Sequence, residues 1–178
     1  GIYPVRLGIG MIAEAMSDRM GRENISLYSA CDEVSHENKR ITHVKINGRE
    51  LVSVGSLINT LPLHDFVKML RPRLPEPVIA AAEELRFRDM MLLVLFVDKT
   101  RISHNASIYF PDPSVPFTRI YEPKNRSESM SPPGKTALVV EIPIQKEEPL
   151  WNAPRSVLTA QVVEVCSKYG LLRTEDVI

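Results

Sequence analysis

A run of eight consecutive apolar residues, Met90–Val97, constrains the fold of this chain more than any other feature. Its length is typical of a buried strand, because a membrane-spanning helix needs about 20 apolar residues. Three further strand-like runs follow, separated by clusters of the turn-forming residues Pro, Gly, Asn, Ser and Asp. These runs are Ala106–Phe110, Pro116–Glu122 and Lys135–Ile142. The sequence therefore predicts a four-stranded sheet in the second half of the chain.

The first half predicts helices and a small β-meander. Apolar residues recur at helical spacing between Ile9 and Met20, directly after the turn Gly8-Ile9-Gly10. Asn47-Gly48 is a strong signal for a two-residue hairpin turn. The remaining predicted elements of this half are strands Ile25–Ala30, Ile41–Ile46, Glu50–Val54 and Ser56–Thr60 and a short helix between Leu63 and Leu70.

Prolines mark the helices that flank the predicted sheet. Three prolines within 71–77 indicate a boundary, and Pro77 suits the first position of a helix that ends near Leu85. A last helix begins at Pro154 and has Gly170 as its C-terminal cap. Its predicted buried stripe is Leu158, Val162, Val165 and Tyr169. The fold class is therefore α+β, with a four-stranded sheet, flanking helices and a β-meander.

Charge and composition exclude several classes of function. The formal net charge is zero, so no overall field attracts nucleic acid or an acidic membrane. None of the four histidines lies four residues from another or pairs with a cysteine in metal-ligand spacing, which argues against a metal site. Cys31 and Cys166 are expected to be reduced, buried thiols. With no signal peptide and no membrane span, we expect a cytoplasmic protein.

Arg119 is the residue whose surroundings point most directly to binding. In the strand FTRIYE, alternation places Phe117, Arg119 and Tyr121 on one face. An arginine between aromatic rings can stack and still offer a bidentate fork to a phosphate or carboxylate. The pattern allows equally an ion pair on a solvated sheet face. Glu122, Lys124 and Arg126 are expected to form a surface charge cluster.

Three segments together resemble FAD-dependent amine-oxidase-like flavoproteins. They are YPVRLGIGMIAEAM, then ISLYSACDEVSHENKRITHVKINGRELVSVGSLINTLPL, then the run from LRFRDMMLLVLFVDK through VPFTRIYEPKN to GKTALVVEIP. The order and spacing of the three segments resemble the branch near UDP-galactopyranose mutase and protoporphyrinogen-oxidase-like proteins. The resemblance implies a partial FAD-domain segment at 1–72 and a substrate-domain-like segment at 73–178 that is built on a mixed sheet.

The resemblance also assigns roles to single residues. Gly8 and Gly10 match the turn that faces the flavin, although Leu7 stands where a further glycine is common. Cys31 matches a position whose backbone meets the adenine, and Thr60 and Pro62 match a segment that lies near the cofactor. Arg119 matches an arginine that faces the flavin and the charged part of the substrate, with Tyr121 as its neighbour. No residue matches a catalytic acid or base.

Taken together, the resemblance implies the central, substrate-binding portion of an FAD-dependent oxidoreductase or a mutase-like flavoenzyme. The chain starts at Gly1 and has no G-x-G-x-x-G, so we expect a fragment that is inactive alone and does not retain FAD. Its expected partners are a small-molecule substrate and the remainder of the FAD domain. Apolar surface exposed on the first sixty residues could allow homodimerisation. The alternative is a non-enzymatic α/β binding or interaction module.

Overall fold

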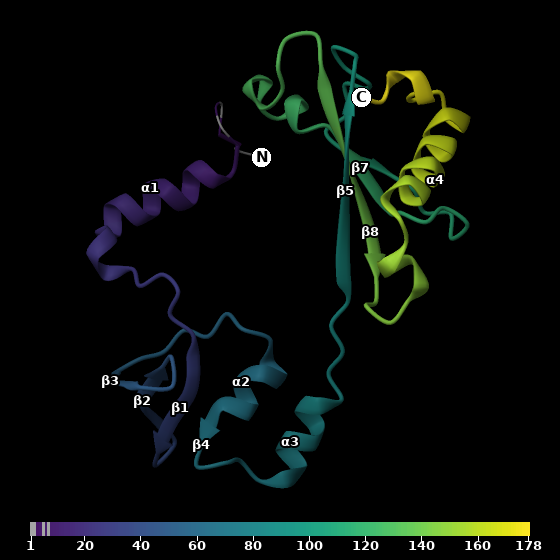
Figure 1. Ribbon diagram of the computed structural model, residues 1–178. Coiled ribbons are helices and arrows are strands. Elements are labelled where there is room, and N and C mark those ends of the chain that lie inside the picture. The colour runs from purple at the N-terminus through teal and green to yellow at the C-terminus, as the bar shows by residue number, and fades with distance from the viewer. Residues whose placement is uncertain (1–2, 5, 7) are drawn as a thin grey trace. The chain divides into compact units, whose positions relative to one another are not determined.

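The computed structural model describes residues 3–4, 6 and 8–178. The chain forms two compact units, one made of Gly1–Met20 with Arg88–Ile178 and the other of Gly21–Phe87 (Figure 1). The described residues contain four α-helices and two four-stranded sheets, which confirms the predicted α+β class. Short 3-10 helices complete the secondary structure: η1 (Arg22–Asn24), η2 (Pro123–Asn125), η3 (Glu128–Met130), η4 (Pro149–Asn152) and η5 (Thr174–Asp176).

The unit Gly21–Phe87 is built on a mixed sheet with strand order β3-β2-β1-β4. Its strands are β1 (Cys31–Glu37), β2 (Arg40–Ile46), β3 (Glu50–Ser53) and β4 (Leu70–Arg71), of which β4 runs parallel to β1. The β2–β3 turn has φ 50° at Asn47 and 68° at Gly48, as a two-residue hairpin with two left-handed positions requires. The hairpin prediction is confirmed.

Helix α2 (Leu63–Met69) packs beside this sheet, and α3 (Glu76–Glu83) packs against α2. Ile79 and Ala82 of α3 are buried against Val67 of α2. Residues 73–87 therefore belong to the same compact unit as the meander, and the units do not divide at the predicted boundary between 72 and 73. The assignment of 1–72 and 73–178 to an FAD domain and a substrate domain stays a prediction.

The other unit is built on a sheet with order β5-β8-β7-β6. Its strands are β5 (Asp89–Val97), β6 (Ile108–Tyr109), β7 (Arg119–Tyr121) and β8 (Thr136–Ile144). Every neighbouring pair is antiparallel, so the mixed sheet lies in the other unit and not here, where it was predicted. β6 and β7 are shorter than the predicted runs Ala106–Phe110 and Pro116–Glu122, and Pro116 has no N–H to donate to a ladder.

Helix α4 (Arg155–Lys168) packs on one face of this second sheet (Figure 1). Leu158 and Val162 are buried as predicted, but Tyr169 is 49% exposed because it follows the last helical turn. Gly170, with φ 68°, donates to Ser167 O and is followed by a bond from Leu171 N to Cys166 O. This pair of bonds is a Schellman motif, which confirms the predicted cap.

Two predicted strands in the unit Gly21–Phe87 are wrong. Ile25–Ala30 has no strand, because Tyr28 adopts a left-handed φ of 57° and the side chain of Asn47 bonds Tyr28 O and Ala30 N. Ser56–Thr60 is irregular and exposed along its whole length. Neither segment buries a face, and a strand needs a partner as well as a sequence pattern.

Helix α1 (Gly10–Met20) is confirmed, but its apolar face is not covered among the described residues. Ile9, Ile12, Met16 and Met20 are 46–60% exposed. Beyond α1, Leu27 and Ile58 are 74% and 90% exposed. The expectation of exposed apolar surface within the first sixty residues is therefore confirmed. Dimerisation through it stays a prediction.

Candidate functional site

The open face of the β5-β8-β7-β6 sheet, opposite α4, carries the predicted substrate-binding residues. In the strand register Arg119 lies between Tyr109 of β6 and Glu141 of β8, and Glu141 lies opposite Leu92 of β5. One row of side chains thus crosses the whole sheet. Tyr121 starts the next row, and the same face of β5 carries the partly exposed apolar residues Met90, Leu92, Val94 and Phe96.

The guanidinium of Arg119 is held by a carboxylate and two aromatic rings. Its Nε donates to Glu141 Oε2 at 2.9 Å, its Nη2 donates to Glu141 Oε1, and its Nη1 lies 3.4 Å from the Tyr109 hydroxyl. The rings of Tyr121 and Tyr109 lie 5.5 and 5.8 Å from the guanidinium carbon, within cation–π distance. The bonds to Glu141, and then that to Tyr109, raise the pKa of Arg119.

Both interpretations of Arg119 from sequence are therefore partly met. It stacks on aromatic rings, but the second ring is Tyr109 and not Phe117, which is 1% exposed and packs on Phe110 in the core. It also makes an ion pair on an open sheet face, because Glu141 occupies its bidentate fork. The remaining polar edge of Arg119, at Nη1, faces Tyr109.

Arg126 is a second cation, beside the row of side chains that contains Arg119. The sequence predicts Arg126 as a member of a surface charge cluster. Its guanidinium carbon lies 5.2 Å from the Tyr121 ring and 5.9 Å from the Tyr3 ring. Nη2 of Arg126 donates to Ser107 Oγ at 3.2 Å. Rings and guanidinium groups thus alternate from Tyr109 through Tyr121 to Tyr3. The sequence feature that could have identified Arg126 is its position close to Arg119 and Tyr121, near the end of the same strand.

Gly8 lies near the same end of the sheet. With φ 77°, it sits so close to Met130 that an added Cβ would meet Met130 Cε at 3.0 Å. The Tyr3 hydroxyl lies 3.7 Å from Met130 Sδ. Contacts of Tyr3 and Gly8 with Arg126 and Met130 therefore attach the predicted glycine turn to the unit that carries Arg119.

The expected surface cluster of Glu122, Lys124 and Arg126 is wrong for its first two members. Glu122 is 2% exposed and Lys124 4% exposed, whereas Arg126 is exposed. The Glu122 carboxylate accepts bonds from Ile102 N at 3.0 Å, Ser103 N at 2.7 Å and Thr136 Oγ1 at 2.8 Å. Buried charge is tolerated only with such bonds, so Glu122 anchors the 99–105 loop onto the strand end.

Lys124 serves the same loop from the other side. Its Nζ donates to Thr100 O at 3.1 Å and Lys135 O at 2.9 Å, and lies 3.6 Å from Glu128. Asn125 adds bonds to Ser103 O and Asn105 O at 2.6 and 2.9 Å. The segment 122–125 is therefore a structural support for the end of the sheet where Arg119, Tyr121 and Arg126 lie.

The other residues assigned to FAD lie in the unit Gly21–Phe87 or at the start of α1. Cys31 begins β1, whose pairing with β4 involves only Val34 and Ser35, so the Cys31 end of that strand has no β4 partner. Thr60 and Pro62 precede α2 on an exposed segment. At Gly10 an added Cβ would meet nothing within 4 Å. Gly8 and Gly10 belong to the unit of Arg119, and Cys31, Thr60 and Pro62 to the other.

The two cysteines differ in exposure. Cys166 is 0% exposed, and burial raises the pKa of its thiol to about 11. Cys31 is half-buried, and its pKa is raised by burial first and by Asp32 second. Both thiols are free, and the expectation that both are buried is met only by Cys166.

These environments predict unequal labelling by a thiol reagent. At pH 8 the native chain is expected to react at Cys31 within minutes, and at Cys166 at least 100-fold more slowly, since the thiolate is the reactive species and needs access. Labelling with iodoacetamide followed by peptide mass spectrometry measures both sites. In denaturant the two rates should become equal. Equal rates in the native chain would contradict the buried position of Cys166.

The described residues include no group of three or more His, Cys, Asp and Glu side chains that could hold a metal ion. A search of the same residues finds no helix long and apolar enough to cross a bilayer. Hollows of about 850 and 620 Å³ lie along α4, away from the open sheet face. Few ionisable groups converge in them, so the row through Arg119 remains the better candidate site.

Comparison with known proteins gives a family match and a set of similar folds. The family model described as flavin containing amine oxidoreductase matches residues 2–175. A crystal structure of reduced UDP-galactopyranose mutase superposes with a TM-score of 0.80 at 23% identity, over 99% of this chain and 38% of that one. A protein from Exiguobacterium sp. 255-15, assigned as a protoporphyrinogen oxidase, gives 0.67 at 18% identity, over 96% and 38%.

A third similar structure is putrescine oxidase bound to putrescine, with a TM-score of 0.68 at 13% identity, over 94% of this chain and 36% of that one. No curated protein sequence matches the chain. At these identities the likeness concerns the fold alone. The chain spans less than two fifths of the length of these solved relatives.

Proposed function

Because the chain belongs to the family of flavin-containing amine oxidoreductases, we propose that it is the central and substrate-binding portion of an FAD-dependent oxidoreductase or mutase-like flavoenzyme. The observation that carries the proposal is the family match over residues 2–175, together with an open sheet face that presents Arg119 and Arg126 between tyrosine rings. Bound FAD would supply the hydride-transfer or covalent-adduct chemistry, and the chain would supply orientation and charge.

The residues proposed to hold FAD fit only part of that cofactor. The open space at Gly10 allows a planar ring to approach the backbone, and the Cys31 end of β1 leaves backbone groups beside which an adenine could lie. Thr60 and Pro62 would lie near the cofactor from the segment before α2. The sequence has no G-x-G-x-x-G at which main-chain amides would cradle the pyrophosphate.

On the substrate side, we assign binding to Arg119 and Tyr121, with Arg126 as a second cation. Glu141 fixes the Arg119 guanidinium and neutralises much of its charge, whereas Arg126 is bonded to a serine hydroxyl and stacked on two rings. An anionic group on the substrate would therefore gain more from Arg126, and a neutral polar group would suit the edge that Arg119 shares with Tyr109.

The proposal predicts weak FAD binding by this chain alone. A fluorescence titration should give a dissociation constant of about 0.1 mM or weaker, because the amides that grip the pyrophosphate supply much of the affinity. Replacing Gly10 with leucine should weaken binding further, whereas Ser17→Leu on the same helix should not. Submicromolar FAD binding by the chain would contradict its assignment as an incomplete FAD site.

The alternative is a non-enzymatic binding or interaction module, and one observation favours it: Glu141 already occupies the fork of Arg119. The two hypotheses separate on the flavin. A flavin spectrum in a protein that contains this sequence, after reconstitution with FAD, supports the enzyme. A colourless protein under the same conditions supports the module.

A further inference from the structure

The turn Asn47-Gly48 connects β2 to β3, and it also holds the segment that leads into β1. The Asn47 side chain bonds this segment twice: Ala30 N donates to Oδ1 at 2.9 Å, and Nδ2 donates to Tyr28 O at 3.2 Å. The main-chain N–H of Asn47 donates to Ala30 O at 2.9 Å. One asparagine therefore fixes the segment 28–30 by three hydrogen bonds.

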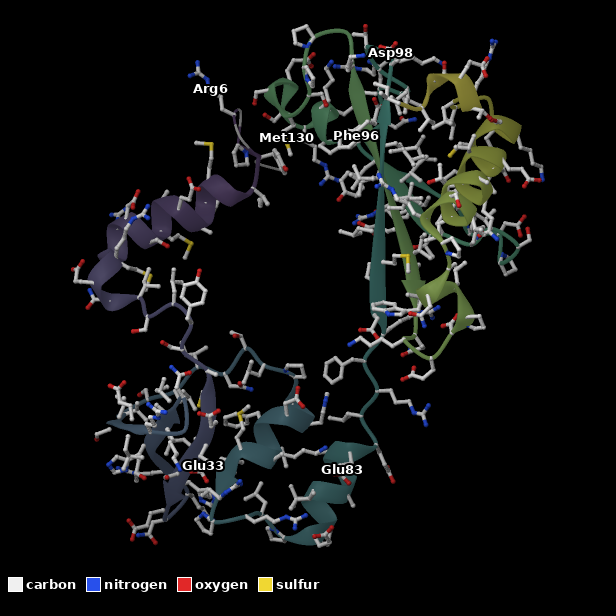
Figure 2. All side chains as sticks on the ribbon, viewed as in Figure 1. Arg6, Glu33, Glu83, Phe96, Asp98 and Met130 are labelled. Carbon is white, nitrogen blue, oxygen red and sulfur yellow. The ribbon has the colours of Figure 1, made fainter. Side chains whose placement is uncertain are left out.

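The same turn is bonded to the residue on the other side of Cys31. There the Asp32 carboxylate accepts a hydrogen bond from Gly48 N. The register between β1 and β2 shifts between Cys31 and Glu33, so Asp32 is the extra residue of a β-bulge, and Figure 2 labels Glu33 directly after it. A bulge changes the direction of the strand that carries it. Both chain neighbours of Cys31 are therefore held by the Asn47-Gly48 turn.

The bond from Asn47 N to Ala30 O also fixes where the main-chain groups of Cys31 point. Opposed residues of an antiparallel pair alternate between hydrogen-bonded and non-hydrogen-bonded positions. Asn47 bonds to Ala30, so the next pair, Cys31 with Ile46, is in a non-hydrogen-bonded position. The N–H and C=O of Cys31 therefore point away from β2, toward the side of β1 that carries β4.

A donor and an acceptor on one residue suit the Watson–Crick edge of adenine. The N–H of Cys31 can donate to N1 of the ring, and its C=O can accept from the N6 amino group. Hypoxanthine presents the opposite pattern, with a donor at N1 and an acceptor at O6, so the same two groups would reject it. This discrimination requires that the N–H and C=O of Cys31 keep their direction, which the bonds at Ala30 and Asp32 control.

We propose that Asn47 is a positioning residue for the adenine end of the FAD site. The inference rests on the proposed function, because it takes Cys31 as the adenine contact. Asn47 acts through the segment 28–30 and does not itself contact the nucleotide. Its side-chain amide supplies both an acceptor for Ala30 N and a donor for Tyr28 O, while its φ of 50° forms the turn. Glycine can adopt the same φ but has no side chain to make those two bonds.

The test is an NMR titration of the isotope-labelled chain with AMP and with IMP, followed at the Cys31 amide. The unmodified chain should bind AMP about tenfold more tightly than IMP. Asn47→Gly should raise the dissociation constant of AMP by about 5- to 10-fold and leave that of IMP nearly unchanged, so that the preference is lost. Asn47→Asp keeps the acceptor for Ala30 N and should keep part of the preference. Hydrogen exchange at the Ala30 amide should become faster in Asn47→Gly.

Asn38→Gly is the matched control, because Asn38 has the same φ of 50° in the turn between β1 and β2, at the other end of β1. It should leave both dissociation constants unchanged. A full preference for AMP in Asn47→Gly, with the Cys31 amide still shifting, would overturn the inference and leave the adenine site in place. If Asn47→Gly does not fold, a full preference in Asn47→Asp has the same meaning. An unmodified chain whose Cys31 amide does not respond to AMP would overturn the adenine site and the inference together.

Discussion

Replacing Glu122 with alanine is expected to lower the free energy of unfolding by on the order of 3 kcal/mol. The carboxylate is 2% exposed and is the acceptor for Ile102 N, Ser103 N and Thr136 Oγ1. Without it, two main-chain N–H groups and a hydroxyl lose their acceptor in a buried place. Each such group costs about 1–3 kcal/mol when it is left unsatisfied. Urea unfolding, followed by circular dichroism and Trp151 fluorescence, measures the loss.

Glu128→Ala is the control for this prediction. Glu128 is also a carboxylate of the 122–131 segment, but its side chain is 70% exposed, and it pairs with Arg101 at 3.0 Å. Exposed ion pairs contribute about 1 kcal/mol or less, so this variant should unfold close to the unmodified chain. Glu122→Gln should fall between the two, since an amide oxygen still accepts but without charge. Equal losses for Glu122→Ala and Glu128→Ala would contradict a structural role for Glu122.

The burial of Glu122 also marks a limit of sequence-based prediction for this chain. In the segment YEPKN, three charged or polar residues follow a strand. The simplest interpretation of that pattern is that their side chains lie on a solvated surface. What buries Glu122 is the return of the 99–105 loop, whose two amides converge on the carboxylate from about twenty positions away. Local spacing carries no information about that convergence. The same holds for Tyr109, which meets Arg119 only through strand pairing.

Other elements could be predicted because their determinants are local. The apolar run Met90–Val97 and the segment around Val139 pair as β5 and β8, and Asn47-Gly48 forms the predicted hairpin turn. Ile25–Ala30 alternates as well, yet it forms no strand, because alternation does not say whether a partner strand or a core is present. The sequence therefore identified the strand and the arginine of the candidate site. It did not identify Glu141 and Tyr109, which bond that arginine.

Arg119→Ala is expected to lower kcat/KM by about 10- to 100-fold in a flavin-loaded protein that contains this sequence, with flavin content nearly unchanged. A hydrogen bond to a charged group contributes about 1.5–3 kcal/mol, and 1.4 kcal/mol is a factor of ten. The substrate panel follows the similar structures: an amine, a porphyrinogen and UDP-galactopyranose. Flavin content is read from the absorbance spectrum, and substrate use from anaerobic flavin reduction or product formation.

The pair with Glu141 makes a single substitution ambiguous, because Arg119→Ala also leaves a carboxylate that is 14% exposed without its cation. The double variant Arg119→Ala/Glu141→Ala resolves this. If Arg119 contacts substrate, the double variant stays as impaired as the single one, and the loss appears in KM as well as in kcat. If Arg119 serves only to neutralise Glu141, the double variant regains activity and stability together. Arg126→Ala removes a cation that is bonded to Ser107 and stacked on the rings of Tyr3 and Tyr121. A loss of substrate use in this variant would show that an anionic substrate group binds there instead.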